Sequence, residues 1–147
     1  MMVPRTYTFW KERWQSPTAW LEALEQSLRD TGAVSARGGD YDSWDLGVCG
    51  GTLGSARLQM LVEEHGAGKQ LARVRTWPVV SAGGFALIVL FCVLAVIAGS
   101  QQAWLACAIL QAAGVAIAIR MALESAAAMS RLDRALGGLL EVLDRQR

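Results

Sequence analysis

The sequence predicts an α+β membrane protein in which a small cytoplasmic domain is joined to a transmembrane helical hairpin. Two features carry this prediction. Residues 79–98 and 103–123 are apolar runs separated only by residues 99–102, and no charged residue precedes Arg120 in this part of the chain. Before the runs, apolar residues recur first with the period of a helix and then with the period of strands. Domain boundaries are therefore expected at 1–78, 79–123 and 124–147.

Each apolar run is long enough to cross a bilayer. About 20 apolar residues, each rising about 1.5 Å in a helix, span a hydrocarbon core of about 30 Å. Two crossings return the chain to the side it left. Basic residues flank the hairpin and are absent from its turn; they are Lys69, Arg73, Arg75, Arg120, Arg131 and Arg134. Because basic residues favour the cytoplasmic side, both termini are expected in the cytoplasm.

Composition excludes several classes of function. The net charge is +1, and no segment gathers the lysines and arginines that several phosphate contacts would need, so no nucleic-acid partner is expected. The cysteines Cys49, Cys92 and Cys107 lack CxxC partners, and two of them lie in the apolar runs. His65 is the sole histidine, and its strand neighbours point to opposite faces. We therefore expect no metal, no cofactor and no catalytic residue.

The cytoplasmic domain should pair one helix with a small sheet. Ser16 and Pro17 are typical of a helix start, and the helix should run to about Asp30 with one apolar face: Trp20, Leu21, Leu24 and Leu28. Residues 1–13 are expected to be irregular or a short helix, and residues 33–41 a linker. The helix should cover the sheet's apolar face.

A three-stranded antiparallel meander should follow the linker. Its first strand is indicated by the alternation of Trp44, Leu46 and Val48 with polar and small residues. The second and third strands flank a loop at residues 66–68, and their expected pairs are Val62 with Ala72, Met60 with Val74, Leu58 with Thr76, Gln59 with Arg75 and Arg57 with Trp77. Pro78 should end the third strand and begin the membrane helix.

The final segment, 124–147, is predicted to be an amphipathic helix with an apolar seam. Residues of the seam recur at spacings of three and four: Met129, Leu132, Leu136, Leu139 and Leu143. The seam is expected to pack on the cytoplasmic domain or on a larger partner. Self-association into a homo-oligomer and contact with the membrane surface stay open as alternatives.

Candidate interaction residues lie in three places. Besides the seam, the polar face of the sheet should carry Arg57, Arg73 and Arg75 toward a larger membrane protein or enzyme. Within the bilayer, Gln111 should turn inward and bond to a backbone carbonyl, to a hydroxyl such as that of Ser81, or to another subunit. Gly114 and Ala118 form a small-xxx-small pair that lets helices approach closely.

Residues 37–58 (RGGDYDSWDLGVCGGTLGSARL) and 62–78 (VEEHGAGKQLARVRTWP) resemble a segment of bacterial membrane-associated family 2 glycosyltransferases. In those enzymes the segment belongs to a C-terminal extension that ends in a membrane hairpin. The resemblance covers about residues 14–134 and carries over no catalytic residue. It implies a non-catalytic accessory module for making or exporting an envelope polysaccharide, as a separate subunit or a detached piece. The alternative is an accessory subunit of an unrelated transport or signalling complex.

Overall fold

The computed structural model describes residues 4–11, 14–39, 41–65 and 69–144, without the side chains of Lys11, Leu140 and residues 142–144. Along these residues the elements are β1 (Arg5–Lys11), α1 (Pro17–Asp30), β2 (Ser35–Arg37), β3 (Leu46–Cys49), β4 (Gly54–Glu64), β5 (Gln70–Val80), α2 (Ala82–Ser100) and α3 (Trp104–Asp144). The fold is therefore mixed α+β, with one antiparallel sheet and three helices, two of them long and apolar. The mixed class, the antiparallel sheet and the two apolar helices are as the sequence predicts.

The strands form one antiparallel sheet in the order β1-β5-β4-β3-β2. The long strands β4 and β5 pair in the predicted register, with Leu58 opposite Thr76 and Met60 opposite Val74. The hairpin closes with a hydrogen bond from the backbone N–H of His65 to the carbonyl oxygen of Lys69, 2.9 Å away. The predicted loop at residues 66–68 lies outside the described residues.

The sheet has five strands where the sequence predicts three. Residues 5–11, expected to be irregular or helical, form β1 at the edge of the sheet, where Tyr7 pairs with Val74 and Phe9 with Ala72. Residues 35–37, expected in a linker, form β2 and pair with β3. β2 has only three residues, and β1 mixes polar and apolar residues. Each becomes a strand because it pairs with a strand elsewhere in the chain, β1 with β5 and β2 with β3.

Strand β5 also runs two residues past Pro78, which was expected to end it. Pro78 lies beyond the last pair between β1 and β5, so among the described residues β5 pairs on one side only at this point. Proline is tolerated on such an edge. Helix α2 begins instead after Ser81, whose hydroxyl oxygen caps the backbone N–H of Gly84 at 3.5 Å.

Helix α1 forms as predicted. Its N-cap is Ser16, whose hydroxyl accepts a hydrogen bond from the backbone N–H of Ala19 at 3.2 Å, and Pro17 occupies the first helical position. Three residues of the predicted apolar face are fully covered: Trp20, Leu24 and Leu28. Gly32 follows the helix with a left-handed φ of 71°, a conformation that glycine adopts without strain.

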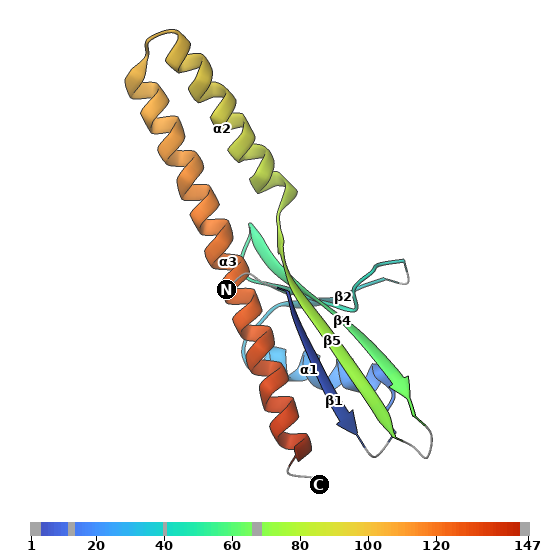
Figure 1. Cartoon of the computed structure of the whole chain (residues 1–147). Coiled ribbons are helices and arrows are strands. Elements are labelled where there is room, and N and C mark those ends of the chain that lie inside the picture. Colours follow the sequence, from blue (N-terminus) through green and yellow to red (C-terminus); the bar gives the residue numbers. More distant parts are fainter. Residues whose placement is uncertain (1–3, 12–13, 40, 66–68, 145–147) are drawn as a thin grey trace.

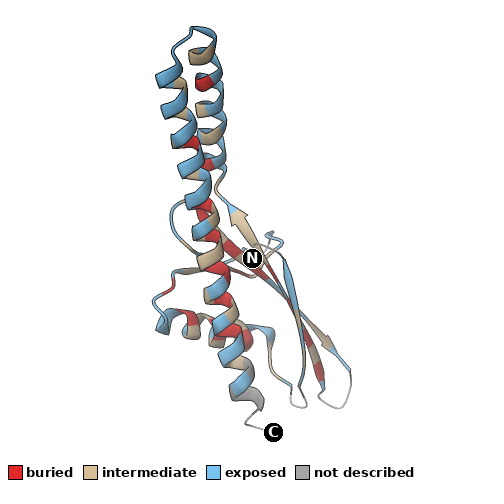
Figure 2. Ribbon diagram, turned by 60° about the vertical axis from the view of Figure 1, so that its left-hand side comes forward, coloured by how far each residue is buried: buried red, intermediate tan, exposed pale blue. Residues whose placement is uncertain are grey.

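Helices α1 and α3 cover one face of the sheet and leave the other face open. Figure 1 shows α3 as a continuous rod that runs from the turn of the hairpin down along the sheet. In Figure 2 the buried residues of α3 form a stripe on the half that faces the sheet and α1. The core between the layers contains Leu24, Leu28, Leu46, Val48, Ala56, Leu58, Val74, Ala128, Met129, Leu132, Ala135 and Leu136.

The second apolar run and the final amphipathic segment are one helix. α3 has 41 residues and therefore extends about 60 Å at about 1.5 Å per residue. Its first half packs beside α2, and its second half packs on the sheet. The turn between α2 and α3 contains Gln102 in a left-handed conformation with φ 58°. No break in the described backbone separates the hairpin from the domain that α3 supports.

Candidate functional site

The candidate site is the open face of the sheet, which faces away from α1 and α3. Strand alternation places Arg57 of β4 and Arg73 and Arg75 of β5 on this face, because their neighbours Leu58 and Val74 are fully buried on the other. The expectation that the three arginines share one face is confirmed. The register sets Arg57 opposite Trp77, Gln59 opposite Arg75 and Leu61 opposite Arg73.

Arg57 is held by an aromatic ring. Its guanidinium carbon lies 4.8 Å from the centroid of the Trp44 ring, a cation–π geometry. The indole is seated over Gly47, where a Cβ would approach to 3.2 Å from a ring carbon. The sequence predicts Trp44 on the same face as Leu46 and Val48, and this is wrong. Residues 41–45 are not in a strand, so the period-two alternation does not extend back to the tryptophan.

The other two arginines differ in their surroundings. The Arg73 guanidinium lies 3.8 Å from the Glu63 carboxylate, and both side chains are well exposed. Such pairs contribute little to stability. Among the described residues, Arg75 has no carboxylate partner, and its side chain lines a hollow in the open face. In the part of the chain that the structure describes, Arg75 therefore has neither the carboxylate partner of Arg73 nor the aromatic partner of Arg57.

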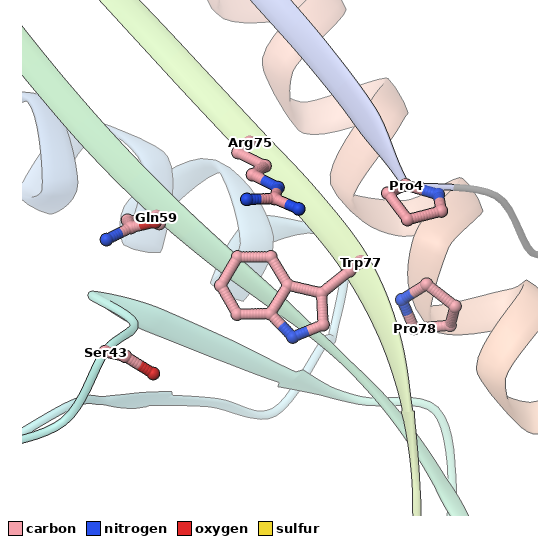
Figure 3. A pocket seen from close by; sticks show the side chains of 6 residues that line it. All are labelled: Pro4, Ser43, Gln59, Arg75, Trp77 and Pro78. Carbon is pink, nitrogen blue, oxygen red and sulfur yellow. The ribbon is translucent and has the colours of Figure 1, made fainter.

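The hollow has a volume of about 570 Å³ and lies at the end of the face nearest the helical hairpin. Figure 3 shows Arg75 and Trp77 side by side on β5, with Gln59 and Ser43 beyond the indole on one side. The full lining consists of Pro4, Ser43, Gln59, Arg75, Trp77 and Pro78. It offers hydrogen-bond donors over an apolar floor and includes no carboxylate.

Residues of the predicted seam lie inside the molecule. Met129, Leu132 and Leu136 belong to the core between α3, α1 and the sheet, and Leu139 is half-buried. The Leu143 side chain lies outside the described residues. Of the two expected destinations, packing on the chain's own domain is the one observed. The expectation that this seam is an exposed contact surface for a partner is corrected, because three of its side chains are already covered.

In the hairpin, only one of the three singled-out residues lies where it was expected. Gly114 is buried against α2, where a Cβ would lie 3.8 Å from Phe91 Cβ. Gln111 and Ala118 are exposed on the outer surface. Gln111 therefore does not turn inward within this molecule, the alternative of a hydrogen-bond partner on another subunit stays a prediction, and Ala118 does not share the glycine's contact. In this part of α3 the buried positions are Gly114 and, seven residues later, Met121. Gln111 and Ala118 lie outside this buried stripe.

The most specific polar contacts of the chain were missed by sequence reasoning. Asp133 of α3 accepts hydrogen bonds from Tyr7, at 2.9 Å, and from Arg5, and thereby ties β1 to α3. The ion pair with Asp133 and the neighbouring tyrosine raise the pKa of the Arg5 guanidinium, the tyrosine contact being the larger effect. No local signal reveals this pairing, because the partners come from opposite ends of the chain.

A second missed contact joins α3 to the turn between β3 and β4. One carboxylate oxygen of Glu124 accepts backbone N–H bonds from Leu53, at 2.6 Å, and from Gly54, at 3.1 Å. The other accepts a bond from Arg120 at 3.0 Å. These contacts hold the pKa of Glu124 below its ordinary value, with the Leu53 bond as the largest cause.

The arrangement of the open face is suited to binding. Among the described residues, no three His, Cys, Asp or Glu side chains converge as a metal site requires. The open face instead presents guanidinium groups, indole rings and amides. Comparison with protein families, with curated proteins and with solved structures gives no match for the chain.

Proposed function

We propose that the chain is a non-catalytic, membrane-anchored accessory module that presents the open face of its sheet to a larger membrane protein. The observation that carries this proposal is the exposed apolar surface of a hairpin rigidly joined to a small domain. The larger protein is proposed to be an envelope polysaccharide glycosyltransferase of a bacterium. That identity is supported by the resemblance of residues 37–58 and 62–78 alone.

The membrane anchor is supported by where the apolar side chains lie. Helix α2 and the apolar part of α3 are long enough to cross a bilayer, and only 11% of each apolar window is buried within the molecule. The core helix of a water-soluble domain would be mostly covered. Large apolar side chains instead point outward along both helices, including Phe85, Leu90, Val96, Trp104, Leu105, Ile109 and Ile119. Lipid is the surroundings in which such a surface is stable.

The orientation of the anchor is supported by charge. Arg120 marks the end of the second apolar run, and the arginines of the sheet lie beyond the other end of the hairpin. The turn at residues 99–102 has none. Under the positive-inside rule, the sheet and both termini face the cytoplasm of a bacterial inner membrane.

The domain is fastened to the anchor at several points. The backbone N–H of Ser81 donates to the carbonyl oxygen of Leu53 at 2.9 Å, and the Ser125 hydroxyl donates to that of Val79 at 3.4 Å. Together with Glu124, these bonds join β5, the β3–β4 turn and α3 where the hairpin meets the sheet. A face held in this way stays at a fixed height and orientation relative to the bilayer, which suits docking.

Charge complementarity defines the expected partner surface. The open face carries Arg57, Arg73 and Arg75, and among the described residues a carboxylate pairs with only one of them, in the contact between Arg73 and Glu63. A partner should therefore offer a cytoplasmic surface rich in Asp and Glu. Electrostatic matching of this kind steers association and fixes orientation.

The test is site-specific crosslinking in native membranes. A photo-crosslinking amino acid at the exposed Gln59, on the open face, should capture one larger membrane protein. The same amino acid at the exposed Glu22, on the outer side of α1, serves as the control. The double variant Arg57→Glu with Arg73→Glu should abolish capture, whereas Arg29→Glu on α1 should not. Equal capture from both positions would contradict docking through the open face. Capture of a transporter or a signalling protein would instead establish the alternative assignment.

A further inference from the structure

We propose that the hollow beside Arg75 and Trp77 binds a soluble organic phosphate, with the phosphate on the arginine and an apolar, flat part of the ligand on the indole. This inference goes beyond docking and does not depend on it. It rests on the donor set of the lining, on Arg75, which has no carboxylate partner among the described residues, and on the distance from the hairpin.

The donor set matches an anion with several oxygens. Arg75 brings a planar fork of N–H donors, and the lining adds the Gln59 amide and the Ser43 hydroxyl. No lining residue is acidic. A carboxylate ligand has two oxygens, whereas a phosphate offers three with a charge near −2, so a phosphate uses this number of donors more fully.

Arg75 is the guanidinium on this face that is available for such a ligand. Arg57 lies over the Trp44 ring, and Arg73 lies near Glu63. Among the described residues, Arg75 has neither an aromatic ring nor a carboxylate as a partner, yet its backbone is fixed in β5, which pairs with β1 on one side and β4 on the other. A guanidinium held by a rigid strand binds phosphate oxygens in pairs with little rearrangement.

The rest of the hollow is apolar and sized for a small molecule. Figure 3 shows Pro4 and Pro78 on one side of the Trp77 indole, and it shows the Arg75 side chain next to the same indole. The volume of about 570 Å³ falls within the range of small-molecule sites, which is about 300–1,000 Å³. A flat apolar group attached to the phosphate would therefore contact the indole and the prolines.

The ligand is expected to be soluble because Arg75 lies seven residues before the start of α2, on a strand that leads away from the membrane. The C-terminal end of β5 joins α2, which begins at Ala82. In Figure 1 the N-terminal end of β5 is the end farther from the hairpin. At about 3.3 Å per residue, Arg75 lies roughly 23 Å along the chain from that helix. The headgroup layer on one side of a bilayer is only about 5–8 Å thick.

The experiment measures binding of phenyl phosphate and of inorganic phosphate to the full chain in nanodiscs of phosphatidylcholine, by equilibrium dialysis. Saturable binding of phenyl phosphate is expected, with inorganic phosphate weaker. Arg75→Gln should weaken both by roughly tenfold or more, because it removes charge-assisted hydrogen bonds. Trp77→Leu should weaken phenyl phosphate alone. The matched control is Arg73→Gln, on the same strand and face but outside the hollow, and it should change neither affinity by more than about twofold.

Three outcomes would overturn the proposal. One is the absence of saturable binding by the unmodified chain, and another is an equal loss in Arg73→Gln. The third is displacement of phenyl phosphate when the nanodiscs contain phosphatidylglycerol, since a lipid headgroup would then be the natural occupant. Unchanged thermal unfolding of Arg75→Gln excludes misfolding as the cause of a loss. Because the docking test changes Arg57 and Arg73 and leaves Arg75 intact, failure of one proposal is distinguishable from failure of the other.

Discussion

Glu124 of α3 accepts a hydrogen bond from the backbone N–H of Leu53, 2.6 Å away, at the point where the sheet meets the helical hairpin. The Glu124 carboxylate thereby holds the turn between β3 and β4 next to α3. The same carboxylate also bonds Arg120, one turn earlier in α3. The position of the sheet relative to the hairpin therefore depends on an ionised side chain.

This contact predicts a pH dependence of stability. The bonds from Leu53 and Arg120 lower the pKa of Glu124 in the folded chain, so folding is favoured while the carboxylate is ionised. The stabilisation is present above the ordinary glutamate pKa of about 4.3 and is lost as the pH falls through the lower folded value. In thermal unfolding, Glu124→Gln should be less stable than the unmodified chain at pH 7, and the difference should narrow in acid. Glu141→Gln, an exposed control on α3, should keep the unmodified profile. A difference in thermal stability between Glu124→Gln and the unmodified chain that stays constant across the pH range would contradict this role of the Glu124 carboxylate.

A second prediction concerns the close approach of Gly50 to α3. A Cβ at Gly50 would lie 1.9 Å from the backbone oxygen of Glu124, so Gly50→Ala must push the turn and the helix apart. We expect a loss of about 1–3 kcal/mol or more in the free energy of unfolding. Gly137→Ala is the control, because Gly137 is helical and has nothing within 4 Å of a Cβ. Its expected effect is a gain of up to about 1 kcal/mol. Equal effects of the two changes in thermal unfolding would exclude this packing.

A third prediction tests the two faces of the sheet. Met60 is half-buried and packs against the core, whereas its neighbour Gln59 is exposed on the open face. Met60→Asp places a carboxylate against apolar residues and should cost about 1–3 kcal/mol. Gln59→Asp should be tolerated. Limited proteolysis of the two variants provides the measurement, and equal resistance would mean that the faces are assigned wrongly.

The fourth prediction is the topology of the hairpin. A reporter that is active only in the cytoplasm should function when fused after Arg147. A reporter that is active only outside should function when inserted at residues 99–102, where the turn carries no charge. Both expectations follow from the distribution of basic residues. The reversed pattern would place the sheet outside the cytoplasm and remove the docking proposal with it.

Features with a local cause could be predicted from the sequence. The start of α1 follows from Ser16 and Pro17, and the pairing of β4 with β5 follows from alternation about one short loop. The two apolar helices follow from the length and composition of their runs. The shared face of Arg57, Arg73 and Arg75 follows from that register alone. In each case, a few neighbouring residues contain all the information required.

Features that depend on distant partners could not be predicted in the same way. Residues 5–11 become a strand only because β5 offers an edge, and Asp133 anchors that strand from α3. The seam around Leu132 shows a helical period, but the period does not say which surface will cover it. Trp44 has the spacing of a strand residue although the chain turns there. The hollow at Arg75 likewise requires Pro4 and Ser43, which come from two other segments.

The edge position of β1 restricts how two copies of this protein could assemble. Two identical edge strands pair antiparallel about a two-fold axis perpendicular to the sheet, and such an axis reverses the direction of every strand. Since β5 leads directly into α2, the second copy's hairpin would then point the opposite way. Two hairpins in one bilayer must insert from the same side. A symmetric pair joined through β1 could therefore only bridge two apposed membranes, and partners within one membrane must meet about an axis that runs along the hairpin.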